Sequence, residues 1–125
     1  MKYKVLLADD NSEFRLLIRI FLSKNFIVET AENGLEALDI IEKGFQPDII
    51  ISDLMMPDID GLTMISQIKR NKKCSNVPVI MLSTIDRNAL GIDLSKIGLD
   101  DFILKPFNPK DLITKMEKLL HKVAC

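Results

Sequence analysis

Short apolar runs alternate along the chain with segments in which apolar residues recur every three or four positions. Three of the runs, VLLA, IIIS and VIMLS, are almost continuously apolar. Parallel β-strands covered on both faces have this composition, because neither face meets water. The runs predict five strands: Tyr3–Ala8, Ile27–Thr30, Ile49–Ser52, Val79–Ser83 and Phe102–Leu104.

The segments between and after the strands place their apolar residues on one helical stripe, which predicts five helices. The stripes are, in chain order, Phe14, Leu17, Ile18, Phe21 and Leu22; Leu35, Leu38 and Ile41; Leu62, Ile65 and Ile68; Leu90, Leu94 and Ile97; and Leu112, Ile113, Met116, Leu119, Leu120 and Val123. Ser12, Asn33 and Asn108 are candidate N-caps. Gly44 and Gly98 suit helix ends, where a left-handed residue is often required.

Strict alternation of strands and helices predicts an α/β fold, a doubly wound parallel sheet with helices on both faces. No linker, repeat or low-complexity stretch interrupts the pattern, so we expect residues 1–125 to form one domain. Sheets of this kind bind ligands beyond the C-terminal ends of their strands. The residues at those ends are therefore the first candidates for a functional site.

Composition narrows the class of protein. The 125 residues include 17 basic and 18 acidic side chains, and 47% are hydrophobic, which is typical of a globular protein. This balance does not favour a nucleic-acid or membrane surface. Neither a secretory leader nor an apolar stretch of roughly 18 residues is evident. Cys74 and Cys125 lack zinc-binding spacing, so we expect a cytoplasmic protein with free thiols.

Acidic residues, a hydroxyl and a lysine gather at the predicted strand ends. Asp9 and Asp10 follow the first strand, Asp53 follows the third, Ser83 ends the fourth and Lys105 follows the fifth. Three carboxylates held together repel one another, and Mg²⁺ suits such a set because it takes oxygen ligands. Lys105 and Ser83 could hold a phosphate. Singly these residues read as a helix cap, a turn or a surface lysine, but together they indicate a site.

The sequence resembles the receiver domains of bacterial two-component response regulators over essentially its whole length. The resemblance is carried by LLADDN at 6–11, DLMMPDIDG at 53–61, VPVIMLS at 77–83 and GLDDFILKPF at 98–107. It implies a flavodoxin-like fold with strand order 2-1-3-4-5 and a phosphorelay signalling switch, not an enzyme. Asp53 would accept a phosphoryl group from a histidine kinase or phosphotransfer protein. The domain would assist both its own phosphorylation and its dephosphorylation.

The resemblance also implies a ligand set for Mg²⁺. Asp10, Asp53 and the backbone carbonyl of Met55 would bind the cation directly, and Asp9 would bind it through water. Lys105 would contact the phosphate, and the peptide bond that follows it would be cis, which is uncommon.

Ser83 and Phe102 resemble the hydroxyl and aromatic switch residues of the family. Phosphorylation would bias a two-state equilibrium and change the face formed by the fourth helix, the fifth strand and the fifth helix. Asp101 and Lys115 on that face match one charge pair of the family's symmetric dimers. We therefore expect either a weak, phosphorylation-promoted homodimer or an effector at this face. No membrane contact is expected, and nucleic acid would be bound only through a separate output domain.

Two alternatives share parts of this pattern. A flavodoxin would need a glycine- and hydroxyl-rich phosphate loop after the first strand, where this chain has Asp9-Asp10-Asn11. An aspartate-nucleophile phosphohydrolase resembles DxDx[TV] at that point and usually carries an insertion that covers the substrate, which is missing here. The sequence does not identify the kinase, the stimulus or the downstream target.

Overall fold

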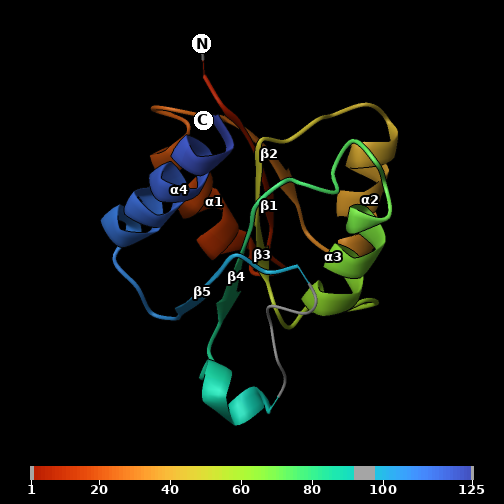
Figure 1. The fold of residues 1–125 in the computed structure, drawn as a ribbon. Helices are drawn as coiled ribbons and strands as arrows, with labels where there is room; N and C mark the ends of the chain where they lie inside the picture. Colours follow the sequence, from red (N-terminus) through yellow and green to blue (C-terminus); the bar gives the residue numbers. More distant parts are fainter. Residues whose placement is uncertain (1, 92–97, 125) are drawn as a thin grey trace.

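The computed structural model describes residues 2–91 and 98–124. Five parallel strands form one sheet in the order β2-β1-β3-β4-β5, which confirms the predicted order (Figure 1). The strands are β1 Lys4–Ala8, β2 Ile27–Ala31, β3 Ile49–Asp53, β4 Val79–Ser83 and β5 Asp101–Leu104. Each predicted strand is confirmed, with ends that agree to within a residue.

The described residues contain four α-helices and one short 3-10 helix. They are α1 Ser12–Leu22, α2 Gly34–Glu42, α3 Gly61–Lys69, the 3-10 helix Arg87–Leu90, and α4 Pro109–Ala124. The fourth of the five predicted helices, with Leu94 and Ile97, lies largely outside the described residues, so α4 is here the C-terminal helix. Gly44, which follows α2, has a φ of 111°, as glycines at helix ends often do. Gly98 has a φ of 85°, and the helix predicted before it lies largely outside the described residues. Within the described ranges, no helix is long and apolar enough to cross a membrane.

Two helical layers enclose the sheet. Helices α1 and α4 lie on one face, and α2 and α3 lie on the other (Figure 1). Because side chains alternate along a strand, Val5 and Leu7 pack toward α1 and α4, whereas Leu6 and Ala8 pack toward α2 and α3. All four are fully buried. Burial on both faces explains why the central strands are continuously apolar.

The first helix begins differently from the prediction. Ser12 is the first helical residue and not the N-cap, so that assignment is wrong. Asn11 is the cap, and its side-chain oxygen accepts a hydrogen bond of 2.9 Å from the Phe14 N–H. Asparagine and serine can both act as N-caps, and Asn11 does so here because it lies three positions before the Phe14 N–H. Asn33 and Asn108 cap α2 and α4 with their side-chain oxygens, as predicted.

Two leucines predicted on buried stripes are exposed. Leu17 is 66% exposed and Leu35 is 54% exposed. The buried face of α1 is centred on Ile18 and Leu22, and Leu17 lies about 100° away from Ile18 around the helix. In α2 the buried positions include Ala37 and Ile41, which face away from Leu35. The buried face of α2 is therefore centred on Ala37 and Ile41, and Leu35 lies outside it.

Candidate functional site

The register of the sheet brings the predicted site residues to one edge. Ala8 pairs with Ser52 across β1 and β3, so Asp9 and Asp53 leave these strands side by side. Ser83 pairs with Leu104 across β4 and β5. The next N–H along β5, that of Lys105, donates a hydrogen bond of 2.7 Å to the Ser83 carbonyl oxygen. The four chain segments therefore meet where the strands end.

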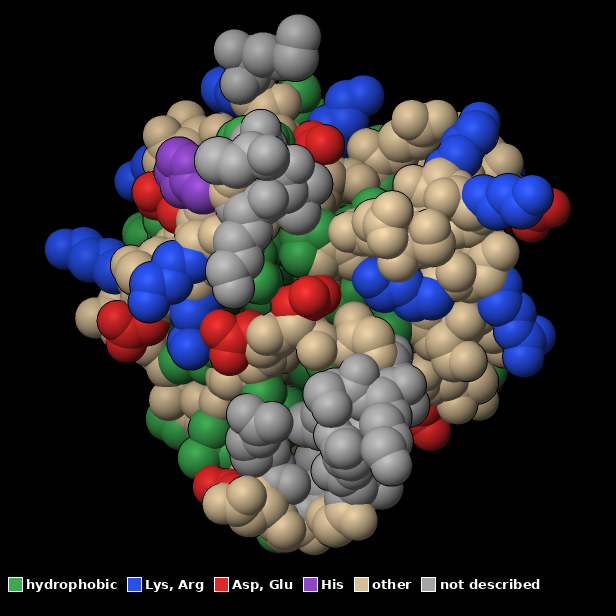
Figure 2. Space-filling model, viewed as in Figure 1, with side chains coloured by type: hydrophobic (Ala, Val, Ile, Leu, Met, Phe, Trp, Pro, Cys, Tyr) green, Lys and Arg blue, Asp and Glu red, His purple; other side chains and the backbone are tan. Residues whose placement is uncertain are grey.

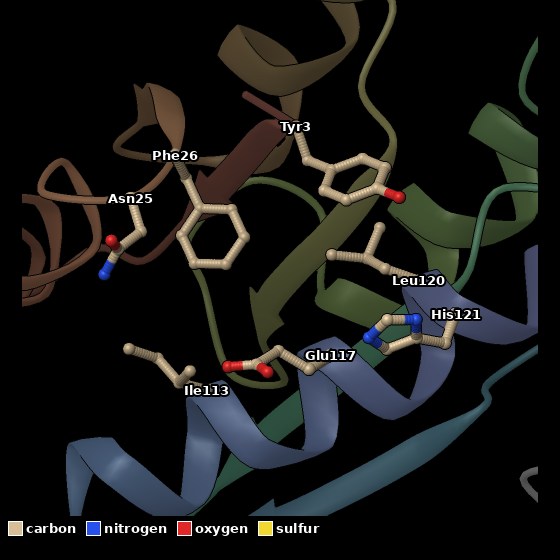
Figure 3. A pocket seen from close by; sticks show the side chains of 7 residues that line it. All are labelled: Tyr3, Asn25, Phe26, Ile113, Glu117, Leu120 and His121. Carbon is tan, nitrogen blue, oxygen red and sulfur yellow. The ribbon is translucent and has the colours of Figure 1, made fainter. Parts of the chain in front are cut away.

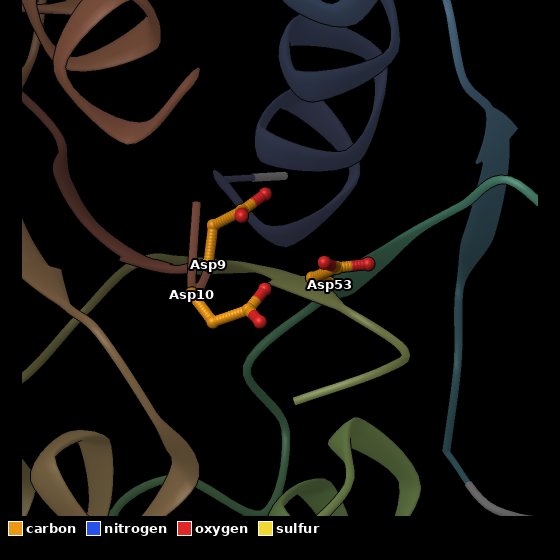
Figure 4. Close-up of side chains that lie close together, drawn as sticks. All are labelled: Asp9, Asp10 and Asp53. Carbon is orange, nitrogen blue, oxygen red and sulfur yellow. The ribbon is translucent and has the colours of Figure 1, made fainter. Parts of the chain in front are cut away.

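Three carboxylates form the centre of this edge. Asp9 and Asp10 follow β1, Asp53 ends β3, and the three side chains lie close together (Figure 4). One oxygen from each carboxylate lies within 4.8 Å of the other two. Asp9 is fully buried, Asp53 is largely buried and Asp10 is exposed. The cluster is therefore open to solvent on the side of Asp10.

Lys105 provides positive charge to the cluster. Its Nζ lies 2.9 Å from Oδ2 of Asp9 and 3.5 Å from Oδ2 of Asp53. The other oxygen of Asp9 accepts a hydrogen bond of 2.9 Å from the Asn11 N–H. Both carboxylate oxygens of Asp9 thus have partners within the protein. The peptide bond between Lys105 and Pro106 is cis, as the resemblance implied.

The pKa of Asp53 is raised above its ordinary value. Burial of its carboxylate is the main cause, the negative charges of Asp9 and Asp10 add to it, and Lys105 opposes it. One ammonium cannot compensate three carboxylates, so two negative charges remain when all three acids are ionised. The electrostatics therefore favour an added cation at this edge.

The oxygen cluster fits a hard divalent cation better than it fits a softer metal. Its ligand atoms are all carboxylate oxygens, which hard divalent cations prefer. Among the residues that the structure describes, none donates a hydrogen bond to the carboxylate of Asp10, so it keeps its full capacity to bind a cation. Met55 lies in the loop that directly follows β3, and its side chain is 61% exposed. Coordination by its backbone carbonyl stays a prediction.

The loop from Leu54 to Gly61 is tightly closed beside Asp53. The Gly61 N–H donates a hydrogen bond of 2.8 Å to the Leu54 carbonyl oxygen. A β-carbon at position 61 would collide with the backbone carbonyl oxygen of Asp53, so only glycine allows α3 to start this close to the site. Asp58 has a positive φ of 71°, which is uncommon for a residue other than glycine. Sequence reasoning did not identify this close approach.

The two predicted switch residues lie on neighbouring strands. Ser83 is buried at the end of β4, and its hydroxyl oxygen accepts a hydrogen bond of 2.8 Å from the Ile85 N–H. Phe102 is half-buried in β5 and packs against the core on the α2 and α3 side. Their position agrees with the prediction, and their role in switching stays a proposal.

Sequence reasoning missed two residues of α1 that reach the site. The ring of Phe14 lies beneath the Lys105 ammonium, with 4.2 Å between Nζ and the ring centroid. Nη1 of Arg15 donates a hydrogen bond of 2.8 Å to the backbone carbonyl oxygen of Asp9. The apolar periodicity places Phe14 on a helical stripe, and no motif signals its contact with a lysine so distant in sequence.

A separate cavity lies at the opposite ends of the strands. It has a volume of about 290 Å³ and is lined by Tyr3, Asn25, Phe26, Ile113, Glu117, Leu120 and His121 (Figure 3). Tyr3 and Phe26 precede β1 and β2, so this cavity is remote from the carboxylates.

The molecular face in Figure 2 shows basic side chains dispersed among acidic and uncharged ones, without one continuous basic patch.

Comparisons with known proteins agree on one family. The family model of the response regulator receiver domain matches residues 5–117. The chain is 36% identical over 124 residues to the transcriptional regulatory protein ResD of Bacillus subtilis, covering 97% of this chain and 49% of ResD. It is 34% identical over 119 residues to a chemotaxis protein CheY homologue of Campylobacter jejuni, covering 94% of this chain and 92% of that protein.

Solved structures show the same likeness. The chemotaxis protein CheY4 of Vibrio cholerae has a TM-score of 0.89 and 29% identity, covering 95% of this chain and 99% of that one. A Francisella response regulator receiver domain has a TM-score of 0.86 and 32% identity, covering 98% and 99%. The chain spans about half the length of the transcriptional regulators that it matches, such as ResD. Sequence, fold and relatives together show that the chain belongs to the response regulator receiver domain family of two-component signalling systems.

Proposed function

We propose that residues 1–125 form one receiver domain that works as a phosphorylation switch in the cytoplasm, with Asp53 as the phosphoacceptor. The phosphoryl donor is a histidine kinase or a phosphotransfer protein. The observation that carries this proposal is the position of the Asp53 carboxylate. It lies at the end of β3, within 4.8 Å of two other carboxylates and 3.5 Å from the Lys105 ammonium.

The chemistry requires little from the protein beyond alignment and charge compensation. A carboxylate oxygen of Asp53 forms a bond to phosphorus while the bond from phosphorus to the donor's histidine nitrogen breaks. The leaving nitrogen keeps the electron pair, and Asp53 becomes an acyl phosphate. In hydrolysis, the oxygen of a water molecule forms a bond to phosphorus while the bond from phosphorus to the Asp53 oxygen breaks. The carboxylate keeps the electron pair, and inorganic phosphate is released.

Asp10, Asp53 and the Met55 carbonyl would hold Mg²⁺ directly. Asp9 would act through water, which agrees with the partners that both of its carboxylate oxygens already have in Asn11 and Lys105. Bound there, Mg²⁺ would compensate the negative charge of the carboxylates and of the phosphoryl oxygens.

Lys105 and Ser83 would stabilise the phosphorylated state. The Lys105 ammonium already lies beside Asp53 and would pair with an added phosphoryl group. The Ser83 oxygen accepts from the Ile85 N–H, which leaves its own O–H free to donate to a phosphoryl oxygen. If Ser83 moves toward the phosphoryl group, the side chain of Phe102 on the adjacent strand would move with it and change the protein surface there.

The surface that would carry the signal includes β5 and α4, and we name it the β5–α4 face. A cavity of about 550 Å³ lies between these elements, and its lining includes Phe102, Leu104, Phe107, Asp111 and Lys115. Leu104 is 45% exposed there. A mixed apolar and charged hollow of this kind suits either a second copy of the chain or an effector protein.

Labelling with a small phosphodonor tests the proposal. With acetyl phosphate and Mg²⁺, the wild-type protein should gain a single base-labile phosphoryl group, measured by intact mass spectrometry. Asp53→Asn should gain none, whereas Asp39→Asn, which changes an exposed acid on α2, should be labelled like the wild type. A chelator should abolish labelling. Equal labelling of wild type and Asp53→Asn would refute the assignment.

The same preparation separates this function from the two alternatives. A flavodoxin would be coloured by its flavin, and a phosphohydrolase would turn over a generic phosphomonoester. We expect a colourless protein without such turnover. Beryllofluoride, which stands in for a phosphoryl group, should bind only to protein that retains Asp53 and holds Mg²⁺.

A further inference from the structure

The Lys105 ammonium has an aromatic neighbour in addition to its two carboxylates. Nζ lies 4.2 Å from the centroid of the Phe14 ring, 2.9 Å from Asp9 and 3.5 Å from Asp53. The face of an aromatic ring carries negative potential and attracts a cation at this distance. Lys105 is only slightly exposed, so water competes weakly for the ammonium. The ring therefore acts on the same group that would meet the phosphate.

The position of the ring is fixed by two elements. Phe14 lies in the first turn of α1, and its N–H donates to the side-chain oxygen of Asn11. Its ring meets that of Phe107 edge to face, with centroids 5.8 Å apart and an angle of 82° between the planes. Phe107 belongs to the short connection between Lys105 and α4. The ring thus joins α1 to the segment that carries the lysine.

A lysine needs this kind of support because its side chain is long and its ammonium has no preferred direction. The carboxylate of Asp9 is nearer to Nζ than that of Asp53, so charge attraction alone would draw the ammonium toward Asp9. A ring against the side chain restricts these movements and excludes water from one side of Nζ.

We propose that Phe14 is a positioning residue for Lys105, whose ring face holds the ammonium beside Asp53, where the phosphoryl group arrives. This role rests on the proposed function of Asp53 and Lys105. The same helix supplies a matched control. Nζ of Lys24 lies 6.0 Å from the ring centroid of Phe21, at the other end of α1 and away from the carboxylates.

The first test reads the contact without any phosphorylation. In metal-free protein with ¹³C-labelled lysine, the ring current of Phe14 should shift the ε-methylene signals of Lys105 upfield. Phe14→Leu should remove this shift, and Phe21→Leu should leave it in place. Identical Lys105 signals in wild type and Phe14→Leu would overturn the proposal.

The second test changes the ring electronics while nearly preserving its shape. Stepwise fluorination of the phenylalanine at position 14 weakens the negative potential of the ring face. Beryllofluoride affinity and the rate of acetyl phosphate labelling should fall progressively, by about two- to fivefold at full fluorination. The same fluorination at position 21 should change neither quantity. In a Lys105→Met background, fluorination at position 14 should also have no effect.

The outcomes separate the two proposals. Suppose that the wild type is labelled, but fluorination at position 14 changes beryllofluoride affinity and labelling rate no more than fluorination at position 21 does. Phe14 then has no positioning role, while the function of Asp53 stands. If no protein is labelled and none binds beryllofluoride, the proposed function is refuted, and the role of Phe14 in the reaction is refuted with it. The ring-current shift would then report a structural contact only.

Discussion

At the scale of single residues, the carboxylate of Asp53 is held in surroundings that disfavour its charge. Burial and two neighbouring acids raise its pKa, against the opposing effect of Lys105. The folded protein therefore keeps a proton on Asp53 over a pH range where the unfolded chain has lost it. Its ionisation destabilises the fold as the pH rises through the folded pKa, and this cost is absent below the unfolded pKa of about 3.9.

Asp53→Asn should therefore raise the free energy of unfolding at pH 7 in the presence of a chelator, measured by urea denaturation. The difference from wild type should shrink as the pH falls below the unfolded pKa of about 3.9, because the Asp53 carboxyl is then protonated in both the folded and the unfolded state. Magnesium at ten times its Kd should stabilise the wild type by about 1.4 kcal/mol and should have a much smaller effect on Asp53→Asn. Equal stabilisation of both proteins by Mg²⁺ would place the cation elsewhere.

The acids and Lys105 could be predicted from sequence because a parallel sheet gathers the residues that follow its strands at one edge. The contact of Phe14 with Lys105 could not be predicted in this way. It depends on how α1 lies on the sheet, and a single phenylalanine in an apolar stripe has the same sequence signature whether it packs only in the core or also under a lysine.

At the scale of elements, the loop that follows β3 is braced by α2. The side chain of Ile59 packs directly against Gly34 in the first turn of that helix. A β-carbon at position 34 would lie 2.8 Å from Cδ1 of Ile59 and closer still to Cγ1. The start of α2 can therefore pack this closely against the loop that carries Met55 only because residue 34 has no side chain.

Gly34→Ala should destabilise the protein by about 1–3 kcal/mol, because it overpacks the contact with Ile59. In an Ile59→Ala background, the same change should cost little, since the atoms that it meets have been removed. Gly44→Ala is the control, because nothing lies within 4 Å of its added carbon and its cost comes only from the positive φ of 111°. That cost should be the same in both backgrounds. A cost of Gly34→Ala that is independent of residue 59 would contradict this account.

Strand bounds were easier to predict than helix faces, for a physical reason. A strand buried on both sides has an uninterrupted apolar run, as in Ile49–Ile51 of β3, and polar residues mark the two ends of that run. A helix has one buried face, and extra apolar residues beside it, such as Leu17 and Leu35, obscure where that face is centred. Asn11 and Ser12 illustrate the same ambiguity at a helix start, because both can act as caps.

At the scale of the whole molecule, the β5–α4 face already holds a charge pair within one chain. Nζ of Lys115 lies 3.1 Å from Oδ2 of Asp101, and both side chains are partly exposed. The family resemblance implies that these two residues could instead pair across the axis of a dimer. A dimer in which Asp101 of one chain paired with Lys115 of the other would break the ion pair within each chain. Exposed ion pairs contribute little free energy, so this exchange would stabilise the dimer only slightly. We therefore expect association to be weak and promoted by beryllofluoride.

Mixing two single variants tests this pairing. Asp101→Lys and Lys115→Asp each place like charges together within the chain, and each alone should dimerise about tenfold more weakly than wild type. If the pairs form across the axis, an equimolar mixture should give heterodimers, because each reversed charge then meets its opposite on the other chain. Light scattering with beryllofluoride measures both effects. A mixture that associates no better than the separate variants would place the interface elsewhere.

The order of the strands could not be read from apolar periodicity, because periodicity records which residues are buried and not which strands are neighbours. It came from the family resemblance, and the structure confirms it. The helix predicted around Leu94 and Ile97 falls largely outside the described residues, so the prediction of five helices is tested for four of them.

The position of β1 inside the sheet, between two other strands, has a consequence for how the fold opens. This strand pairs with β2 on one side and β3 on the other, and its residues from Val5 to Ala8 are fully buried. Edge strand β5 pairs only with β4. Fluctuations that release β5 leave the hydrogen bonds of β1 intact, whereas freeing β1 divides the sheet. Amide hydrogen exchange should therefore be slowest in β1 and β3, at a free energy near that of global unfolding, and faster in β5.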